Sequence, residues 1–300
     1  MIVIQEPAEL QSEIKRRRFA AARMGRELSV GLVPTMGYLH EGHASLLRKA
    51  RANDVVVLSI FVNPIQFGPN EDFERYPRDA QRDLALAEQE GVDIVFMPEV
   101  KHMYPQRAKT KVQVSDLTSG LCGASRPGHF DGVTTVVSKL FHIVVPDFAY
   151  FGMKDAQQVA VLSQMVRDLN MNVTLVPCPI VREQDGLALS SRNVYLSDEQ
   201  REQALVLSAS LKEARQRIDE GGITTAADLK AFLTDRILSK PLAEIDYVDV
   251  LTFPGLEALP ENAKIQEIEG DIIAALAVKF GSTRLIDNML LQKKGVAIYA

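Results

Sequence analysis

The feature that most restricts the fold is the alternation of short apolar runs with helical patterns over about the first 180 residues. Five apolar runs, each bounded by turn residues, predict buried strands at residues 29–33, 55–62, 92–97, 147–151 and 173–176. Helical patterns separate them at residues 44–52, 78–90, 133–144 and 156–170. Because parallel strands need crossover connections, this alternation predicts an α/β fold with a Rossmann-like, doubly wound parallel sheet.

The pattern changes after Val181, where a polar turn is followed by a different order of elements. The expected elements are helices that begin near Ser197 and Thr225 and strands at residues 245–249 and 272–278. Residues 197–200 have the spacing of a capping box, which predicts a helix that continues to about Asp219. We therefore expect a Rossmann-like domain at residues 1–181 and a smaller α+β domain at 182–300, and we assign no function to residues 289–300.

Charge and hydropathy limit the partners that this chain can have. The 300 residues include 34 Lys and Arg against 39 Asp and Glu, and the net charge of -5 argues against coating nucleic acid or an anionic membrane. The run at residues 15–18 is basic, and we interpret it as the solvated face of a helix. The longest apolar run, at residues 272–278, is far below the roughly 20 residues that span a bilayer.

The cellular compartment can also be predicted from the sequence. The N-terminus lacks the features of a secretory signal, and the two cysteines, Cys122 and Cys178, fit a reducing cytoplasm. We expect a cytoplasmic protein without a structural disulfide.

The most informative segment lies at residues 33–43, between the first predicted strand and a helix. Free N–H groups and the helix dipole make this position suitable for phosphate, and Gly37 and Gly42 permit tight turns and close backbone approach. His40 and His43 lie three positions apart and could donate hydrogen bonds to phosphate oxygens as charge builds in a transition state. The segment therefore predicts a phosphate-binding catalytic site.

Two other interpretations of these histidines stay open. His-Glu-Gly-His is one residue shorter than the zinc motif His-Glu-x-x-His, and the sequence offers no obvious third ligand. A plain surface loop is disfavoured because the chain has only five histidines and two of them fall within four positions.

A second cluster begins where the next predicted strand ends. Asn63 and Gln66 carry neutral donors and acceptors, which suit a carboxylate or a hydroxyl group. An ordinary turn after a strand is an equally good interpretation of this pair. The charged stretch at residues 70–83 is either a mobile loop over the site or a solvated connector.

Two further clusters carry positive charge. Lys154 offers a point charge for phosphate, Asp155 could hold ribose hydroxyls or help to place a metal, and Gln158 follows one turn later. Beyond the expected domain boundary, two hydroxyls and the guanidinium of Arg192, at residues 190–192, could surround a polyphosphate. A Lys-Asp pair at the start of a helix is by itself more typical of capping, but all four clusters occur at predicted strand ends or at the domain junction, and capping does not explain all four.

Together, these motifs resemble the pantoate–β-alanine ligase (pantothenate synthetase) family. The matching segments are Pro-Thr-Met-Gly at 34–37, His-x-Gly-His at 40–43, Phe-Val-Asn-Pro-x-Gln-Phe at 61–67, Arg-Pro-Gly-His-Phe-x-Gly-Val at 126–133, Gly-x-Lys-Asp-x-Gln-Gln at 152–158 and Leu-Ser-Ser-Arg at 189–192. They occur in order from about residue 20 to 200, with weaker likeness to about Asn288. His-x-Gly-His alone would mark only a broader nucleotidyltransferase superfamily.

The resemblance implies a reaction in two steps. The carboxylate of (R)-pantoate attacks the α-phosphate of ATP and pyrophosphate leaves; the amine of β-alanine then displaces AMP from pantoyl adenylate, giving pantothenate. Mg²⁺ is expected with the triphosphate, although the sequence identifies no protein ligands for it. The resemblance also implies a homodimer.

Site residues are implied by the same resemblance. The catalytic residues would be His43, as proton donor, with His40 and Lys154. ATP would contact Met36, Gly37, Tyr38, Leu39, His40, Glu41, Gly42, His43, Gly152, Met153, Lys154, Asp155, Val181, Leu189, Ser190, Ser191 and Arg192. The acid and amine substrates would contact Gln66, Gln158, Asn63 and Arg126. Met153 departs from the family pattern, which more often has a polar residue there.

The sequence disfavours two alternative functions. The first is a nucleotidyltransferase or a synthetase fragment that uses the same histidine motif to activate another acid. A tRNA partner would need a basic face and a long recognition region, which the net charge and the roughly 120 residues after the boundary disfavour. A non-catalytic nucleotide-binding regulator would not need Gln66 and Gln158. We therefore expect small-molecule substrates only, with neither nucleic acid nor a membrane as partner.

Overall fold

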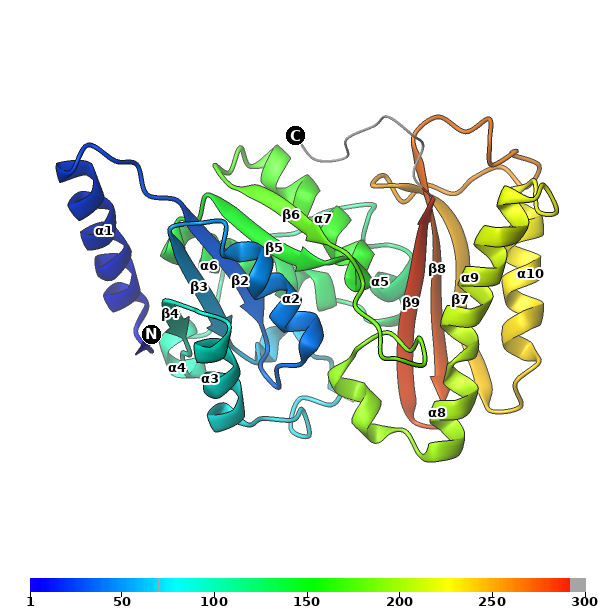
Figure 1. Cartoon of the computed structure of the whole chain (residues 1–300), viewed down its shortest axis with the longest axis horizontal. Coiled ribbons are helices and arrows are strands. Elements are labelled where there is room, and N and C mark those ends of the chain that lie inside the picture. The colour runs from blue at the N-terminus through cyan, green and yellow to red at the C-terminus, as the bar shows by residue number, and fades with distance from the viewer. Residues whose placement is uncertain (70, 292–300) are drawn as a thin grey trace.

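The computed structural model describes residues 1–69 and 71–291, which form two sheets with helices packed on them (Figure 1). The larger sheet is entirely parallel, with the order β1-β4-β3-β2-β5-β6. Its strands are β1 (Ile2–Ile4), β2 (Val30–Thr35), β3 (Val55–Ile60), β4 (Ile94–Phe96), β5 (Phe148–Gly152) and β6 (Thr174–Cys178). The predicted α/β fold with a doubly wound parallel sheet is thus confirmed, and β1, a three-residue strand, is an addition to it.

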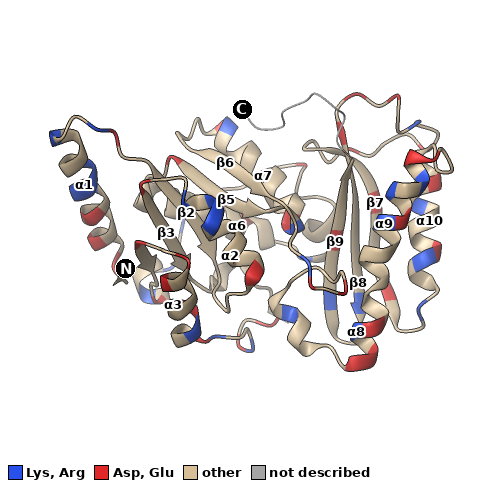
Figure 2. Cartoon of the chain, viewed as in Figure 1, with Lys and Arg blue, Asp and Glu red and all other residues tan. Residues whose placement is uncertain are grey.

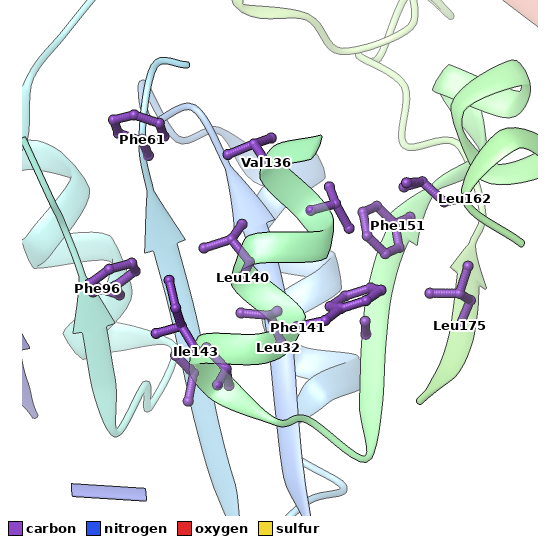
Figure 3. Close-up of a cluster of buried hydrophobic side chains, with 14 of the residues drawn as sticks. Leu32, Phe61, Phe96, Val136, Leu140, Phe141, Ile143, Phe151, Leu162 and Leu175 are labelled. Carbon is purple, nitrogen blue, oxygen red and sulfur yellow. The ribbon is translucent and has the colours of Figure 1, made fainter. Parts of the chain in front are cut away.

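Helices cover both faces of this sheet. They are α1 (Pro7–Arg23), α2 (Glu41–Ala50), α3 (Ala80–Gln89), α4 (Val100–Met103), α6 (His129–Val144) and α7 (Ala156–Asp168), whereas the short α5 (Leu121–Ser125) contacts strands of the C-terminal part. Successive residues of β3 enter different cores: Val57 packs with α1, α6 and α7, and Val56 packs with α2 and α3. Figure 3 shows the first core, where Leu140 and Phe141 of α6 lie among side chains of the strands. Burial on both faces explains why these strands are continuous apolar runs.

The order of the strands creates a switch point between β2 and β5. From β2 the chain proceeds outward through β3 and β4 on one side, and it later continues through β5 and β6 on the other. In open α/β sheets, ligands bind outside the carboxyl ends of the strands at such a point. The loops that follow β2 and β5 are therefore the ones that this topology assigns to a ligand.

The C-terminal part contains an antiparallel sheet of β7 (Ala243–Phe253), β8 (Asp271–Phe280) and β9 (Thr283–Leu291), in that order. Its helices are α8 (Asp198–Ala204), α9 (Val206–Asp219) and α10 (Ala226–Leu238). The capping box predicted at Ser197 and the helix start predicted at Thr225 are confirmed, and Thr225 also forms a capping box. The single helix expected from 197 to 219 is wrong, because it is divided at Leu205 into α8 and α9. Strand β9 was not predicted; it includes residues 289–291, and the remainder of the expected tail lies outside the described residues.

Charged side chains of both signs are mixed along α1, α9 and α10 (Figure 2). On α1, Arg16 and Arg17 pair with Glu13, and Arg18 pairs with Asp147. These pairs support the interpretation of residues 15–18 as a helix face. In the part of the chain that the structure describes, no helix has the length and apolar character needed to span a membrane.

Candidate active site

The loop between β2 and α2 is held by a buried carboxylate. Gly37 and Tyr38 both have positive φ, 82° and 51°, and so turn the chain sharply after the strand. Asp83 of α3 accepts hydrogen bonds from the backbone N–H groups of Tyr38, at 2.8 Å, and Leu39, at 2.6 Å. A Cβ on Gly37 would lie 2.9 Å from Asp83 Oδ2, so only glycine fits this approach. Asp83 was not predicted as a site residue, yet it determines the path of the chain into His40.

His40 and His43 form a capping box at the start of α2. His40 is the N-cap, and its Nδ1 accepts from the N–H of Gly42 at 3.1 Å; His43 Nδ1 accepts from the N–H of His40 at 3.3 Å. Because each Nδ1 accepts a hydrogen bond, the proton of each neutral ring resides on Nε2. The ring centroids are 4.1 Å apart. The backbone thus fixes the tautomer of both rings and leaves two Nε2–H donors on adjacent imidazoles.

The surroundings keep both imidazoles neutral. Burial, aided by the positive charges of Lys154 and Arg82, lowers the pKa of His40 to about 4. Burial also lowers the pKa of His43 well below its ordinary value, with smaller contributions from His40 and Lys154. At neutral pH both rings are therefore neutral, and each carries one N–H donor.

A hydrogen-bond network after β3 positions Gln66. It lies at the end of the 3-10 turn η1 (Pro64–Gln66), where its Oε1 accepts from Asn63 Nδ2 at 3.1 Å. Asn63 also donates to the carbonyl of Gly132 at 3.1 Å and accepts from the hydroxyl of Tyr104 at 2.9 Å. A Cβ on Gly132 would lie 2.5 Å from Gln66 Cα, so α6 packs directly on the backbone of η1. Asn63 is 1% exposed and fully engaged, and it supports Gln66 instead of facing the hollow itself.

His129 connects Arg126 to this network. Its Nδ1 lies 2.8 Å from the carbonyl oxygen of Gln66, and its Nε2 lies 3.0 Å from Arg126 Nη1. Since a carbonyl only accepts and a guanidinium only donates, the proton of His129 is on Nδ1. Burial and the charge of Arg126 lower the pKa of His129 to about 4. Arg126 in turn forms a two-point ion pair with Glu71.

The segments after β5 and β6 bring positive charge to the same edge of the sheet. Lys154 lies in the 3-10 turn η2 (Met153–Asp155), which leads from β5 into α7. Arg192 lies in η3 (Ser191–Tyr195), where Ser190 is the N-cap. Arg192 is held by Asp72 through two contacts of 3.1 Å, Nε to Oδ2 and Nη2 to Oδ1. The guanidiniums of Arg126 and Arg192 are thus paired with two consecutive acidic residues of one loop.

A hollow of about 240 Å³ lies where these segments meet. The predicted residues that line it are Met36, His40, Gly42, His43, Gln66, Arg126, Gly152, Lys154, Asp155, Gln158, Val181, Leu189, Ser190, Ser191 and Arg192. It shares Lys154, Gln158 and Arg192 with a larger hollow of about 720 Å³ that extends to the C-terminal sheet. Segments far apart in the sequence therefore form one composite site.

Six predicted residues do not line either hollow. They are Gly37, Tyr38, Leu39, Glu41, Met153 and Asn63. Leu39 is fully buried in the core, and Glu41 is exposed and pairs with Arg48. Met153 packs among apolar side chains. The contacts expected of these six residues with ATP or the substrates therefore stay predictions, and none of the six lines a hollow.

The residues that the sequence did not mark as site residues include Tyr76, Glu71 and Asp72. The hydroxyl of Tyr76 lies 3.2 Å from Ser191 Oγ. No signal in the sequence distinguishes these residues from others in a charged loop. Zinc gains no support, because residues 1–69 and 71–291 contain no group of three or more His, Cys, Asp and Glu that could hold a metal ion.

Comparison with known proteins identifies the family. A family model described as pantoate-beta-alanine ligase matches residues 2–290. A pantothenate synthetase from Acetivibrio thermocellus is 57% identical over 293 residues, covering 97% of this chain and 100% of that protein. One from Geobacillus thermodenitrificans is 52% identical, covering 97% of each chain.

Solved structures agree with this result. The crystal structure of pantothenate synthetase from Thermus thermophilus is similar with a TM-score of 0.87 and 45% identity, over 96% of this chain and 99% of that one. Pantoate-beta-alanine ligase from Francisella tularensis, complexed with beta-gamma ATP and beta-alanine, has a TM-score of 0.76 and 35% identity, over 97% of each chain. This chain therefore belongs to the pantoate–β-alanine ligase family.

Proposed function

We propose that the composite hollow at the carboxyl edge of the parallel sheet is the site at which this chain joins (R)-pantoate to β-alanine. The activity is that of the family: ATP is consumed, pantoyl adenylate is the intermediate, and AMP, pyrophosphate and pantothenate are released. The observation that carries the assignment of the site is the pair of neutral imidazoles at the start of α2, opposite Lys154 and Arg192 in one hollow. The ATP and β-alanine held by the Francisella relative support the same chemistry.

In the first step, a carboxylate oxygen of pantoate forms a bond to the α-phosphorus, and the bond from that phosphorus to the bridging oxygen breaks. A carboxylate at neutral pH needs no base, so the task of the protein is to stabilise negative charge on the phosphoryl oxygens and on pyrophosphate. The Nε2–H groups of His40 and His43 donate hydrogen bonds to these oxygens. Lys154 and Arg192 neutralise the phosphates that leave.

This role of His43 differs from that of a proton donor. A neutral imidazole with its pKa far below 7 has no additional proton to give, so His43 acts as a hydrogen-bond donor in the transition state. Removing one such donor typically costs about a hundredfold to a thousandfold in rate. The residue expected to donate a proton is therefore proposed to donate a hydrogen bond.

In the second step, the amine of β-alanine attacks the pantoyl carbonyl and AMP leaves. Gln66 and Gln158, which line the hollow, would hold pantoate through amide donors and acceptors, and Gln66 would also face β-alanine. Asn63 and His129 act on the substrates through Gln66, whose side chain and carbonyl they fix. Arg126 provides a cation near the substrate carboxylates.

Magnesium is proposed to enter with the triphosphate. The described residues offer no preformed cluster of metal ligands, and Asp155 is a carboxylate on the wall of the hollow. This donor set fits an ion that phosphate oxygens and water hold for the most part, as Mg²⁺ prefers. When bound, the ion would supply charge neutralisation on the triphosphate.

The domain division, the cellular location and the oligomeric state are also proposed. A division into residues 1–181 and 182–300 is supported by a C-terminal apolar core that begins at Leu187, while a small cluster of Ala156 and Ala160 with Phe253 and Ile273 joins the two parts. A cytoplasmic location is supported by the free thiols of Cys122 and Cys178. A homodimer rests on the family resemblance, and light scattering on the purified chain tests it.

The proposed function is tested by incubating the chain with Mg-ATP, (R)-pantoate and β-alanine. AMP and pantothenate are the expected products. Pantoate alone should support exchange of labelled pyrophosphate into ATP, because the first step is reversible before the amine arrives. Formation of ADP without exchange would indicate an acyl phosphate and contradict the adenylate route.

A further inference from the structure

Two consecutive residues of β9, Asp287 and Asn288, connect the C-terminal sheet with the loops that carry Lys154 and Arg192. β9 is an edge strand, since it pairs with β8 and with no other strand among the described residues. It contacts both η2 and η3. The C-terminal sheet therefore touches the phosphate side of the hollow through this strand.

The side chain of Asn288 bonds to the backbone on both sides of the Lys154 α-carbon. Its Nδ2 donates to the carbonyl of Met153 at 2.8 Å and to the carbonyl of Lys154 at 3.0 Å. These carbonyls belong to the two peptide planes that flank Lys154. Holding both planes fixes the backbone dihedrals of Lys154 and so the direction in which its side chain leaves the chain. Asn288 is 6% exposed, so water does not readily replace these hydrogen bonds.

Asp287 holds the segment that leads to Arg192. Its carboxylate accepts from Arg182 through Nη1 at 2.6 Å and Nη2 at 2.9 Å, and it is 3% exposed. Arg182 begins a short hairpin, bridged to Ala188, that leads directly into residues 189–192. Asp287 Oδ1 also accepts from the N–H of Asn288 at 2.8 Å, which ties the two anchors together.

We propose that Asn288 is a positioning residue for the adenylation step, which holds Lys154 in place through the backbone of η2. This inference rests on the proposed function. Asparagine is suited to the position because one nitrogen carries two N–H donors, whereas aspartate has none and leucine has neither donor nor acceptor. A displacement of about 1 Å at a charge that stabilises a transition state can reduce the rate about a hundredfold.

The test compares pyrophosphate exchange in the full-length chain and its variants. Asn288→Ala should lower kcat for exchange by about 10- to 100-fold. The KM for pantoate should change by less than about twofold, because Gln66 is held by Asn63 and Gly132. Asn288→Leu keeps the side-chain volume and provides the same test if the alanine variant folds poorly. Asn288→Gln keeps the two donors and should recover part of the activity.

A double-mutant cycle separates positioning from a general structural effect. In a Lys154→Ala background, Asn288→Ala should reduce exchange by less than about threefold, since the group that Asn288 positions is already gone. Asp249→Asn removes the pair with Lys230 at 2.8 Å elsewhere on the same sheet and is the control, with unchanged activity.

The outcomes distinguish this inference from the function on which it rests. Absence of exchange in the wild-type chain would overturn the proposed function itself. Normal exchange in Asn288→Ala, or an equal loss in both backgrounds, would overturn the positioning role while the proposed function stands. A loss confined to the background that retains Lys154 supports it.

Discussion

The ion pair between Asp72 and Arg192 should compete with the binding of ATP. Arg192 lines the proposed phosphate site, but both of its contacts, at 3.1 Å, are to the Asp72 carboxylate. Asp72 occupies the edge formed by Nε and Nη2, so a phosphate that approaches along this edge must displace the carboxylate. Asp72→Asn removes the charge of the competitor and keeps its shape, so the variant should bind ATP more tightly than the wild-type chain.

The magnitude follows from the burial of the pair. The side chains of Arg192 and Asp72 are 29% and 19% exposed. Exposed pairs contribute about 0.2–1 kcal/mol, and hydrogen bonds to charged groups contribute about 1.5–3 kcal/mol. An intermediate value of about 1–2 kcal/mol corresponds to a Kd for ATP that is about 5- to 30-fold lower in Asp72→Asn.

Isothermal titration with a non-hydrolysable ATP analogue, at low and moderate salt, measures this change. Glu74→Gln is the matched control, because it removes an exposed acidic group from the same loop. The gain in Asp72→Asn should exceed that in the control and should shrink as salt increases. An unchanged or higher Kd in Asp72→Asn would refute the competition and would mean that Asp72 helps Arg192 to receive ATP.

Three further outcomes follow from the geometry. His43→Ala and Lys154→Ala should each reduce turnover by at least about a hundredfold in the AMP-release assay, and near-normal rates would contradict the roles given to them. Gly42→Ala should reduce turnover with little loss of stability. A Cβ there would lie 2.8 Å from His40 Cε1 and would push the imidazole ring out of its capping box. Measurements of kcat and of urea unfolding test this prediction, and a fully active variant would contradict it. The pKa of His129 is about 4 in the folded chain and about 6.5 when unfolded, so the unfolded state binds more protons between these values and stability is lost as the pH falls from about 6.5 to 4. Urea unfolding at pH 7.5 and pH 5 measures this effect. Between these two pH values, the free energy of unfolding of His129→Gln should fall by about 1–2 kcal/mol less than that of the wild-type chain. An equal fall in both would rule out the depressed pKa of His129.

The parallel sheet could be predicted because both of its faces are covered. Val56 and Val57 enter different cores, so β3 is apolar at successive positions and stands out in the sequence. β9 cannot be recognised in the same way, because the charged residues Arg284 and Asp287 interrupt its apolar pattern. Both line the larger hollow, and Asp287 also pairs with Arg182. A strand with one face on a binding site carries polar residues on that face, so it lacks the apolar pattern that identifies strands in a sequence.

Much of the site could be predicted from position. His40, Gln66 and Lys154 follow strands directly, and parallel strands bring their carboxyl ends to one edge. Asp83 and Asn288 could not be found in this way, because each acts on a loop that is distant in the sequence. Before the fold is known, Asp83 is an acidic residue on a helix like many others.

The position of β9 in the chain has a consequence for biosynthesis. Among the described residues, every other strand and helix that contributes to the hollow precedes β9, so the parallel sheet is synthesised before the strand that holds Lys154. Nascent or truncated chains could complete the first core and its histidine pair while the lysine turn lacks its anchor. Chains that end before residue 288 would then consume little ATP.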